Sequence, residues 1–148
     1  MNIGNKANVL FVIISTLLLI SCSDELKFVC TEISYTGSDM SPKEIQRDKA
    51  KHLGSEVTLI FYDNSVKLCP EGSNKRDESM VLDKVYSDEY RYNESKRSGD
   101  YYCVDIKLEK WFGYIRSFTL DAYKNGNLQG TATYKRDEWL EEVIDFFN

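Results

Sequence analysis

Residues 101–109 read YYCVDIKLE, and this stretch has the clearest structural pattern in the chain. Its apolar side chains fall at even positions and most of its polar ones at odd positions. Because successive side chains of a β-strand point to opposite faces, this period predicts a strand with one face in the core and one in solvent. Half-buried strands are typical of antiparallel sheets, so the stretch predicts a mainly β domain. The inward set is Tyr102, Val104, Ile106 and Leu108, and the outward set is Cys103, Asp105, Lys107 and Glu109.

A first hairpin precedes this strand in the sequence. Residues 56–62 alternate in the same way, and residues 63–64 are an Asp-Asn pair suited to a turn. A two-residue loop there brings the large apolar side chains of both strands to one face. The expected pairs are Phe61 with Val66 and Leu59 with Leu68.

A second hairpin follows the same strand. Residues 114–123 and 128–135 both have strand character, and Asn125-Gly126-Asn127 separates them. A two-residue loop would pair apolar with polar side chains, whereas a three-residue loop with a bulge keeps one face apolar. We therefore expect the second register. Its pairs are Ala122 with Gly130, Leu120 with Ala132 and Phe118 with Tyr134.

Two segments have helical signals instead. Before residues 42–53, Ser41 suits the N-cap, and Pro42 and Glu44 suit the first and third helical positions, which is a capping box. Residues 138–147 have apolar side chains at helical spacing and acidic ones in the early turns. We expect the first helix on the surface, because it has few apolar residues. The second is expected to pack on the sheet, with a free acidic helix awaiting a partner as the alternative.

Together these elements predict a mainly β (α+β) fold. About seven antiparallel strands follow one another, with a short helix over residues 42–53 and a C-terminal helix over residues 138–147. A meander of this length curls into a small barrel or a curved sheet, because closure removes exposed edges. Strands followed by a late helix resemble a lipocalin-type barrel, and a helix leading into a meander resembles a cystatin-type roll. The glycine-tryptophan signature of lipocalins is missing, so that resemblance is architectural.

The chain begins with an apolar leader. Residues 9–20 read VLFVIISTLLLI, and Lys6 stands before them without any acidic residue. A helix that crosses a bilayer needs about 20 apolar residues, whereas the apolar part of a signal peptide needs about 7–15. This run of twelve residues therefore predicts a removable export signal over residues 1–21.

Leu19-Ile20-Ser21-Cys22 follows the leader and resembles the lipobox of bacterial lipoproteins. The resemblance implies that Cys22 is acylated, for example with palmitate, and becomes the N-terminus of the mature protein. It also implies a lipidated tether over residues 22–27 and a place in the cell envelope at the outer membrane. Residues 28–148 are expected to form a single domain, because a chain of this length can bury one sufficient core. Ser23-Asp24-Glu25 resembles the signal that directs some Bacteroidota lipoproteins to the cell surface. A solvated acidic tether is the alternative.

The charge balance argues against nucleic acid as a partner. The chain has 24 acidic and 19 basic residues, with a formal net charge of -5. A protein that binds a phosphate backbone needs clustered lysine and arginine side chains. We therefore expect no nucleic-acid binding.

Three cysteines remain once Cys22 is assigned to lipid, so at most one disulfide can form. Cys69 and Cys103 are the favoured pair, because both point away from the apolar face of their strands. Three reduced thiols, including Cys30, are the alternative. The chain has one histidine and no C-x-x-C sequence, so we expect no metal site.

The residues of the chain offer little for catalysis. A serine or cysteine nucleophile needs a base, and the lone His52 is expected near the end of a charged surface helix rather than in a cleft. Asp105 and Glu109, with Lys107 between them, predict a solvated charge ladder. We therefore expect neither enzymatic activity nor a cofactor.

Binding is the remaining class of function. Aromatic side chains can line a concave surface for a small apolar ligand, or they can simply fill the core. Residues 111–113 are expected to form an exposed aromatic loop, because a turn that needs glycine is rarely buried. The alternative is an envelope protein partner, held in an inhibitor or immunity role by loops 70–79 and 94–100. The candidate binding residues are Trp111, Phe112, Tyr114, Tyr90 and Tyr92.

Overall fold

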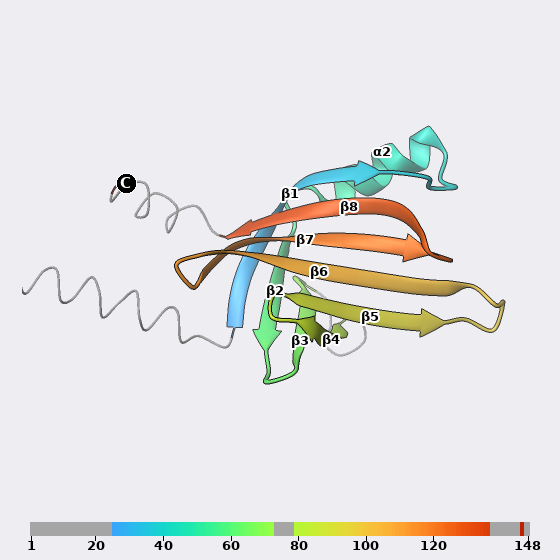
Figure 1. Cartoon of the computed structure of the whole chain (residues 1–148). Helices are drawn as coiled ribbons and strands as arrows, with labels where there is room; N and C mark the ends of the chain where they lie inside the picture. Colours follow the sequence, from blue (N-terminus) through green and yellow to red (C-terminus); the bar gives the residue numbers. More distant parts are fainter. Residues whose placement is uncertain (1–24, 73–78, 137–145, 147–148) are drawn as a thin grey trace, which may run out of the picture.

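The computed structural model describes residues 25–72, 79–136 and Phe146. Within these residues, eight antiparallel strands follow one another in chain order, and the last returns to the first to close a barrel (Figure 1). The meander therefore forms a small barrel rather than an open sheet. The strands are β1 (Glu25–Tyr35), β2 (Glu56–Phe61), β3 (Ser65–Pro70), β4 (Met80–Tyr86), β5 (Glu89–Ser95), β6 (Tyr101–Trp111), β7 (Tyr114–Lys124) and β8 (Asn127–Arg136).

The strand that the sequence analysis did not predict is β1. A tether was expected over residues 22–27, yet β1 already begins at Glu25. Leu26 and Phe28 are buried and alternate with exposed Lys27, which is the ordinary pattern of a half-buried strand. Because β1 pairs with both β2 and β8, this eighth strand is what closes the barrel.

The short helix α2 (Pro42–His52) connects β1 to β2, as the sequence predicts. Its capping box is complete: the Ser41 hydroxyl accepts from the Glu44 N–H, and Oε2 of Glu44 accepts from the Ser41 N–H at 2.7 Å. No residue of α2 is buried, which agrees with its expected surface position. Ile45, Asp48, Lys49 and His52 are half-buried, so the helix packs on the barrel without entering the core.

The first hairpin has the expected register. Tyr62 donates its N–H to the carbonyl of Ser65, at 2.9 Å, around residues 63–64. Val57, Leu59, Val66 and Leu68 are all buried. The alternation of apolar residues therefore determined which residues face each other across this turn. Phe61 pairs with Val66 and Leu59 with Leu68.

The second hairpin confirms the expected apolar register but corrects the turn. Asn125 and Gly126 alone form the loop, with φ of 52° and 80°, so the turn is tight and of the type that favours Asn-Gly. The extra residue lies in the ladder itself, at a register shift between Ala122 and Tyr123. Beyond that shift, the pairs are those expected from the sequence: Ala122 with Gly130, Leu120 with Ala132 and Phe118 with Tyr134.

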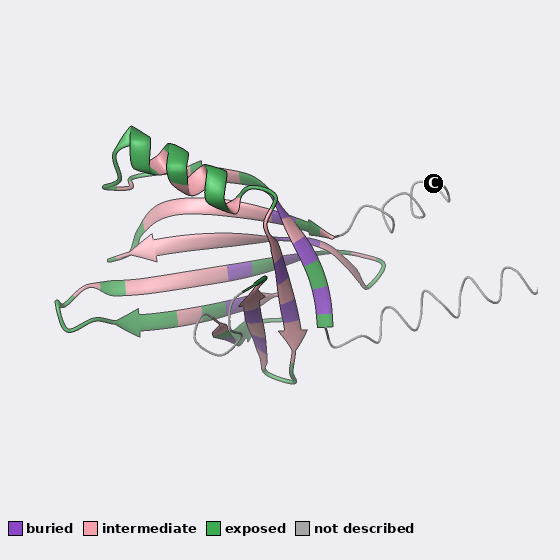
Figure 2. Cartoon of the chain, turned by 180° about the vertical axis from the view of Figure 1, so that it is seen from behind, coloured by how far each residue is buried: buried purple, intermediate pink, exposed green. Residues whose placement is uncertain are grey.

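The fully buried core occupies one end of the barrel, as Figure 2 shows by the buried segments of β1, β2 and β3. We call this the core end. It contains the start of β1, the end of β8, and the turns at residues 62–64, 87–88 and 112–113. We call the opposite end the open end. It contains the end of β1, α2, loop 96–100 and turn 125–126, and its inner residues are only half-buried.

The disulfide suggested by the sequence does not form. Cys69 lies on β3 and Cys103 on β6, with β4 and β5 between them. Each step between strands is about 4.8 Å, whereas the Cα atoms of a disulfide lie about 4.4–6.8 Å apart. Cys30, Cys69 and Cys103 are therefore all free thiols in the described part of the chain.

The leader over residues 1–21, Cys22 and, apart from Phe146, the helix expected over residues 138–147 lie outside the described residues.

Candidate functional site

The inner wall of the open end is formed by β7, β8 and β1, whose paired residues stack in layers. The layer nearest the core contains Phe118, Tyr134 and Cys30, all of them buried. The next two layers, toward the open end, have smaller side chains on β7 and β8. They are Leu120, Ala132 and Ile33, and then Ala122, Gly130 and Tyr35.

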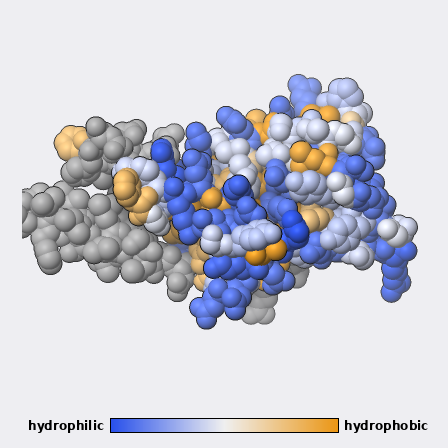
Figure 3. Space-filling view, viewed as in Figure 1, coloured by the Kyte–Doolittle hydropathy of each residue, from blue (hydrophilic) through white to orange (hydrophobic). Residues whose placement is uncertain are grey.

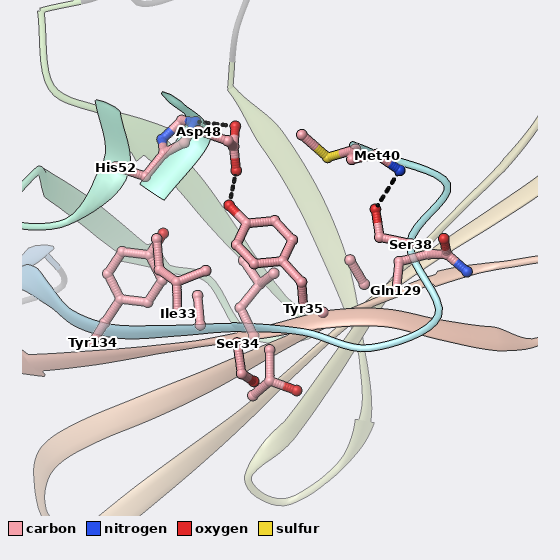
Figure 4. A pocket seen from close by; sticks show the side chains of 14 residues that line it. Ile33, Ser34, Tyr35, Ser38, Met40, Asp48, His52, Gln129 and Tyr134 are labelled. Carbon is pink, nitrogen blue, oxygen red and sulfur yellow. Dashed lines mark hydrogen bonds and ion pairs between the residues drawn. The ribbon is translucent and has the colours of Figure 1, made fainter. Parts of the chain in front are cut away.

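This decrease in side-chain size leaves an open cavity of about 270 Å³ between the wall and α2 (Figure 4). Its surface is mainly apolar. An apolar cavity of roughly 150 Å³ is enough to hold benzene. The cavity therefore has room for a small apolar molecule. Its lining includes Ile33, Leu120, Ala122, Ala132 and Tyr134 from the wall, and Met40, Asp48 and His52 from the side of α2.

A row of polar side chains crosses the rim of the cavity (Figure 4). The Tyr35 hydroxyl donates to Oδ2 of Asp48, and Oδ1 of Asp48 lies 3.3 Å from Nε2 of His52, one turn later in α2. Burial, followed by the hydrogen bond to Asp48 and its charge, raises the pKa of Tyr35. The hydroxyl therefore stays protonated and keeps donating. This contact is a direct side-chain link between the barrel and α2.

The base of the cavity is uncharged. Burial raises the pKa of Tyr134 to about 12, and the neighbouring thiol of Cys30 adds to this effect. Burial also raises the pKa of Cys30, so this thiol is less readily ionised than an exposed one. Among the described residues that line the cavity, Asp48 is the one acidic side chain, and none is lysine or arginine.

Gly130 is required at the rim because β1 and β8 approach closely there. A Cβ atom at this position would lie 2.8 Å from the carbonyl oxygen of Ser34, which belongs to the backbone of β1. A backbone atom cannot move aside as a flexible side chain can. The close approach therefore excludes larger residues at this position.

The position of His52 corrects the expectation from the sequence. It was expected on a charged surface away from any cleft, yet it lines the cavity and pairs with Asp48. The nearby serine hydroxyls act on the backbone: Oγ of Ser38 accepts from the N–H of Met40, and the Ser55 hydroxyl donates to the carbonyl of His52. The histidine pair thus helps to form the rim of an apolar cavity.

The aromatic residues proposed from the sequence do not line this cavity. Tyr90 is buried in the core, and Tyr92 packs against the core. Tyr114 lies under the Arg136 guanidinium, whose carbon is 4.7 Å from the ring centre. Trp111 and Phe112 are in edge-to-face contact at the turn of the core end, far along β6 from the open end. The five residues therefore divide between the core and the β6–β7 turn region of the core end instead of forming one site.

A second, polar depression of about 540 Å³ also lies at the open end. Its charged and amide groups are largely paired with each other. Nζ of Lys124 lies 3.7 Å from Oδ2 of Asp39, and Nδ2 of Asn125 donates to Oδ1 of Asp100 at 3.0 Å. The hydrogen bond from Asn125 lowers the pKa of Asp100. The apolar cavity is therefore the better candidate site.

No group of three or more histidine, cysteine, aspartate or glutamate side chains in the described residues is placed to hold a metal ion. The helix within residues 25–136 that the structure describes is too short and too polar to cross a bilayer.

The signal that could have located the cavity was present in the register of the second hairpin. The expected register places Phe118, Leu120 and Ala122 on one apolar face. The decrease in size along the face, from Phe118 to Ala122 and from Tyr134 to Gly130, marks where space remains. The contributions of Tyr35 and Asp48 had no comparable signal, because one lies on the strand that was not predicted.

Searches for related proteins found no matching family model, no matching curated protein and no matching solved structure.

Proposed function

We propose that this chain is a lipid-anchored binding protein of the cell envelope that takes a small apolar ligand at the open end of its barrel. The observation that carries the binding role is the apolar cavity of about 270 Å³ under α2. Ligand sites are typically concave and mostly apolar, with a few polar groups that orient the ligand. The inner wall, which includes Ile33 and Ala132, supplies the apolar part. The polar side chains of the rim, such as Asp48, supply the orienting groups.

The rim also sets the chemical class of the ligand. Its acidic residue is Asp48, so a ligand carboxylate at the rim would meet a like charge without a neighbouring lysine or arginine to balance it. A hydroxyl or amine on the ligand could instead donate a hydrogen bond to Asp48. The expected ligand is therefore a small apolar molecule, neutral or cationic, with a donor group at one end.

The binding role is favoured over catalysis by the surroundings of His52. Its Nε2 faces Asp48, and the hydroxyls of Ser38 and Ser55 are hydrogen-bonded to the backbone. A nucleophilic mechanism needs a base beside the attacking group. The rim instead places a hydrogen-bonded pair beside apolar side chains, which suits recognition.

A fluorescent probe tests the cavity directly. The neutral dye N-phenyl-1-naphthylamine should bind saturably to the folded protein, with enhanced emission. Ala122→Phe fills the inner wall and should weaken binding by about tenfold or more, which corresponds to roughly 1.4 kcal/mol. Thr119→Phe is the matched control, because Thr119 lies on the outer face of the same strand. Equal dye binding by the two variants, or no saturable binding at all, would overturn the proposed site.

The lipid anchor is tested separately, by labelling cells with palmitate. Label should be present on the wild-type chain and absent from Cys22→Ala. A wild-type chain without label would remove the anchor from the proposal and leave the ligand site unaffected.

A further inference from the structure

The turn between β6 and β7 places an aromatic side chain where turn geometry does not favour it. Phe112 and Gly113 form a two-residue loop with φ of 48° and 78°. This left-handed conformation suits asparagine and glycine and is strained for a bulky residue. The Phe112 side chain is not buried either, since the residue is 92% exposed. Neither the turn nor the core therefore explains a phenylalanine here.

The other turn of this kind shows the expected residue. At the open end, Asn125 and Gly126 form a two-residue loop with φ of 52° and 80°. The same backbone geometry is thus built with asparagine at one end of the barrel and with phenylalanine at the other. Apart from its edge contact with Trp111, the ring of Phe112 is exposed to solvent.

Two further aromatic residues are exposed at the same end. Tyr62, at the turn between β2 and β3, is 55% exposed, and Tyr86, at the end of β4, is 70% exposed. Each hairpin tip of the core end therefore has an exposed aromatic residue. Figure 3 shows apolar residues where β6 turns into β7, beside a mostly hydrophilic surface. We call Tyr62, Tyr86 and Phe112 the aromatic tips.

The open end has a different character. Its loop at residues 96–100 reads KRSGD, and its turn at residues 125–126 is Asn-Gly. Met40, Leu53 and Tyr101 are exposed there, to 37%, 43% and 40%, each less than any of the aromatic tips, and the Tyr101 hydroxyl donates to Asn93. The two ends of the barrel thus differ in the chemistry of their exposed loops.

The start of β1 relates this difference to the membrane. β1 begins at Glu25 in the core end, and Cys22 stands three residues earlier in the sequence. Three residues span at most about 11 Å, whatever their conformation. A lipid chain on Cys22 would therefore hold the core end, and not the open end, close to the bilayer surface. Figure 1 shows the start of β1 and the β6–β7 turn toward the same side of the molecule.

We propose that the aromatic tips of the core end insert into the interfacial layer of a zwitterionic lipid bilayer. This inference rests on the proposed anchor at Cys22. Aromatic side chains favour the boundary between headgroups and acyl chains, where Tyr and Trp keep their polar atoms hydrated. Asp63 is exposed beside the first tip, and Asp88 is paired with Lys110 at 2.7 Å, so the tips lack the basic excess that anionic lipids attract. Docked in this way, the barrel directs its cavity away from the lipid.

Quenching of Trp111 tests this contact in the full-length lipidated protein. Trp111 touches Phe112, with ring centres 4.8 Å apart, and the variant Trp139→Phe leaves it as the only tryptophan. In phosphatidylcholine vesicles that contain brominated lipid, the Trp111 emission should shift to the blue and be quenched several-fold. The matched control has Trp111→Phe, Trp139→Phe and Tyr101→Trp, which moves the only tryptophan to the open end. Its emission should be unquenched.

Phe112→Asn separates insertion from anchoring. Asparagine suits the turn, so the fold persists, and the lipid on Cys22 keeps the protein on the vesicles. Quenching of Trp111 should nevertheless fall several-fold. Quenching that is unchanged in this variant would contradict insertion of the tip.

The outcomes distinguish the inference from the proposed function. Sedimentation with vesicles without quenching of Trp111 would overturn insertion while the anchor holds, and a dimer on the vesicles would then assign the tips to a second copy of the chain. Quenching of Trp111 in Cys22→Ser would support insertion by the tips themselves and show that insertion does not depend on the anchor, which palmitate labelling tests separately. A wild-type chain that neither sediments with vesicles nor is quenched would overturn both, and dye binding in the cavity would be unaffected by any of these results.

Discussion

Phe112 and Asn125 occupy the same left-handed backbone conformation at opposite ends of one barrel, with φ of 48° and 52°. The side chain of Asn125 stabilises its turn: Oδ1 accepts from the N–H of Tyr101 at 2.8 Å, and Nδ2 donates to Asp100. The ring of Phe112 contacts the neighbouring ring of Trp111. The turn at Asn125 is therefore stabilised by hydrogen bonds to the neighbouring strand and loop, whereas the turn at Phe112 retains conformational strain.

Replacing Phe112 should show this strain as a difference in stability. We expect Phe112→Asn to be more stable than Phe112→Ala by about 1 kcal/mol, because asparagine tolerates a positive φ and alanine does not. Both variants lose the ring contact with Trp111, so their comparison isolates the backbone conformation. Urea unfolding of the two variants measures the difference, and equal midpoints would contradict it.

Gly130→Ala should destabilise the barrel at the seam between β8 and β1. The added Cβ atom would lie 2.8 Å from the carbonyl oxygen of Ser34, so the two strands must separate. Overpacking of this kind typically costs about 1–3 kcal/mol. Thermal and urea unfolding would measure it. An unchanged midpoint would show that the strands move apart without cost.

Tyr35→Phe should loosen α2 without harming the core. The variant removes the hydrogen bond from Tyr35 to Asp48, and α2 has no buried residue to compensate. Amide hydrogen exchange in α2 should become faster, by an amount that corresponds to about 1 kcal/mol. Exchange in β6 and β7 should stay as in the wild type. Equal protection of α2 in both proteins would mean that other contacts hold the helix.

The same residue should make stability depend on alkaline pH. Burial and the contact with Asp48 raise the pKa of Tyr35 above that of a tyrosine in the unfolded chain, which is about 10. The stability contributed by the protonated hydroxyl is thus fully present below about pH 10 and is lost as the pH rises toward the folded pKa. Unfolding measured from neutral to alkaline pH should show a shallower decline for Tyr35→Phe than for the wild type.

The ion pair of Arg91 and Asp105 should make the stability of the protein depend on pH in the acidic range. Nε and Nη2 of Arg91 donate to the two carboxylate oxygens of Asp105, at 2.7 and 2.9 Å, and this contact lowers the pKa of Asp105. The stability it contributes is present above about pH 3.9 and is lost as the pH falls through the lower folded pKa. Because the pair is partly exposed, we expect a coupling of about 0.2–1 kcal/mol at neutral pH. A double-mutant cycle with Arg91→Gln and Asp105→Asn should show that this coupling disappears in acid.

The thiols should react in an order set by burial. Cys69 and Cys103 are partly exposed, whereas Cys30 is buried in the core. In the native protein, a thiol reagent should modify Cys69 and Cys103 well before Cys30, which should react only after unfolding. A reductant should leave the melting temperature unchanged. A decrease in melting temperature on reduction would indicate a disulfide that the structure does not contain.

Much of the fold followed from local patterns. The alternation in residues 101–109 and 56–62 predicted the strands because burial on one face selects apolar residues at every second position. The capping box at Ser41 predicted α2 because its hydrogen bonds are made within four residues. By contrast, β1 was missed. Its first residues follow shortly after a lipobox-like sequence, and the two strands that pair with β1, β2 and β8, are distant from it in the chain.

The candidate site was predicted less well than the fold. The aromatic residues Tyr90 and Tyr92 were reasonable candidates by type, but their direction depends on which strands lie opposite, and they point into a filled core. The exposure of Phe112 agrees with the loop expected from its glycine. The cavity arises instead from small residues, Ala122, Gly130 and Ala132, which have no chemical signature of their own.

The sequence alone determined the strand periodicity, the register of two hairpins and the helix start, because each depends on residues close together in the chain. Only the tertiary structure decided that β1 closes the barrel, that Tyr35 meets Asp48 across the rim, and that the aromatic tips gather at one end. Closure pairs β1 with β8, the first and the last strand of the domain in the sequence. The space that it encloses depends on the sizes of side chains that meet only in the folded state.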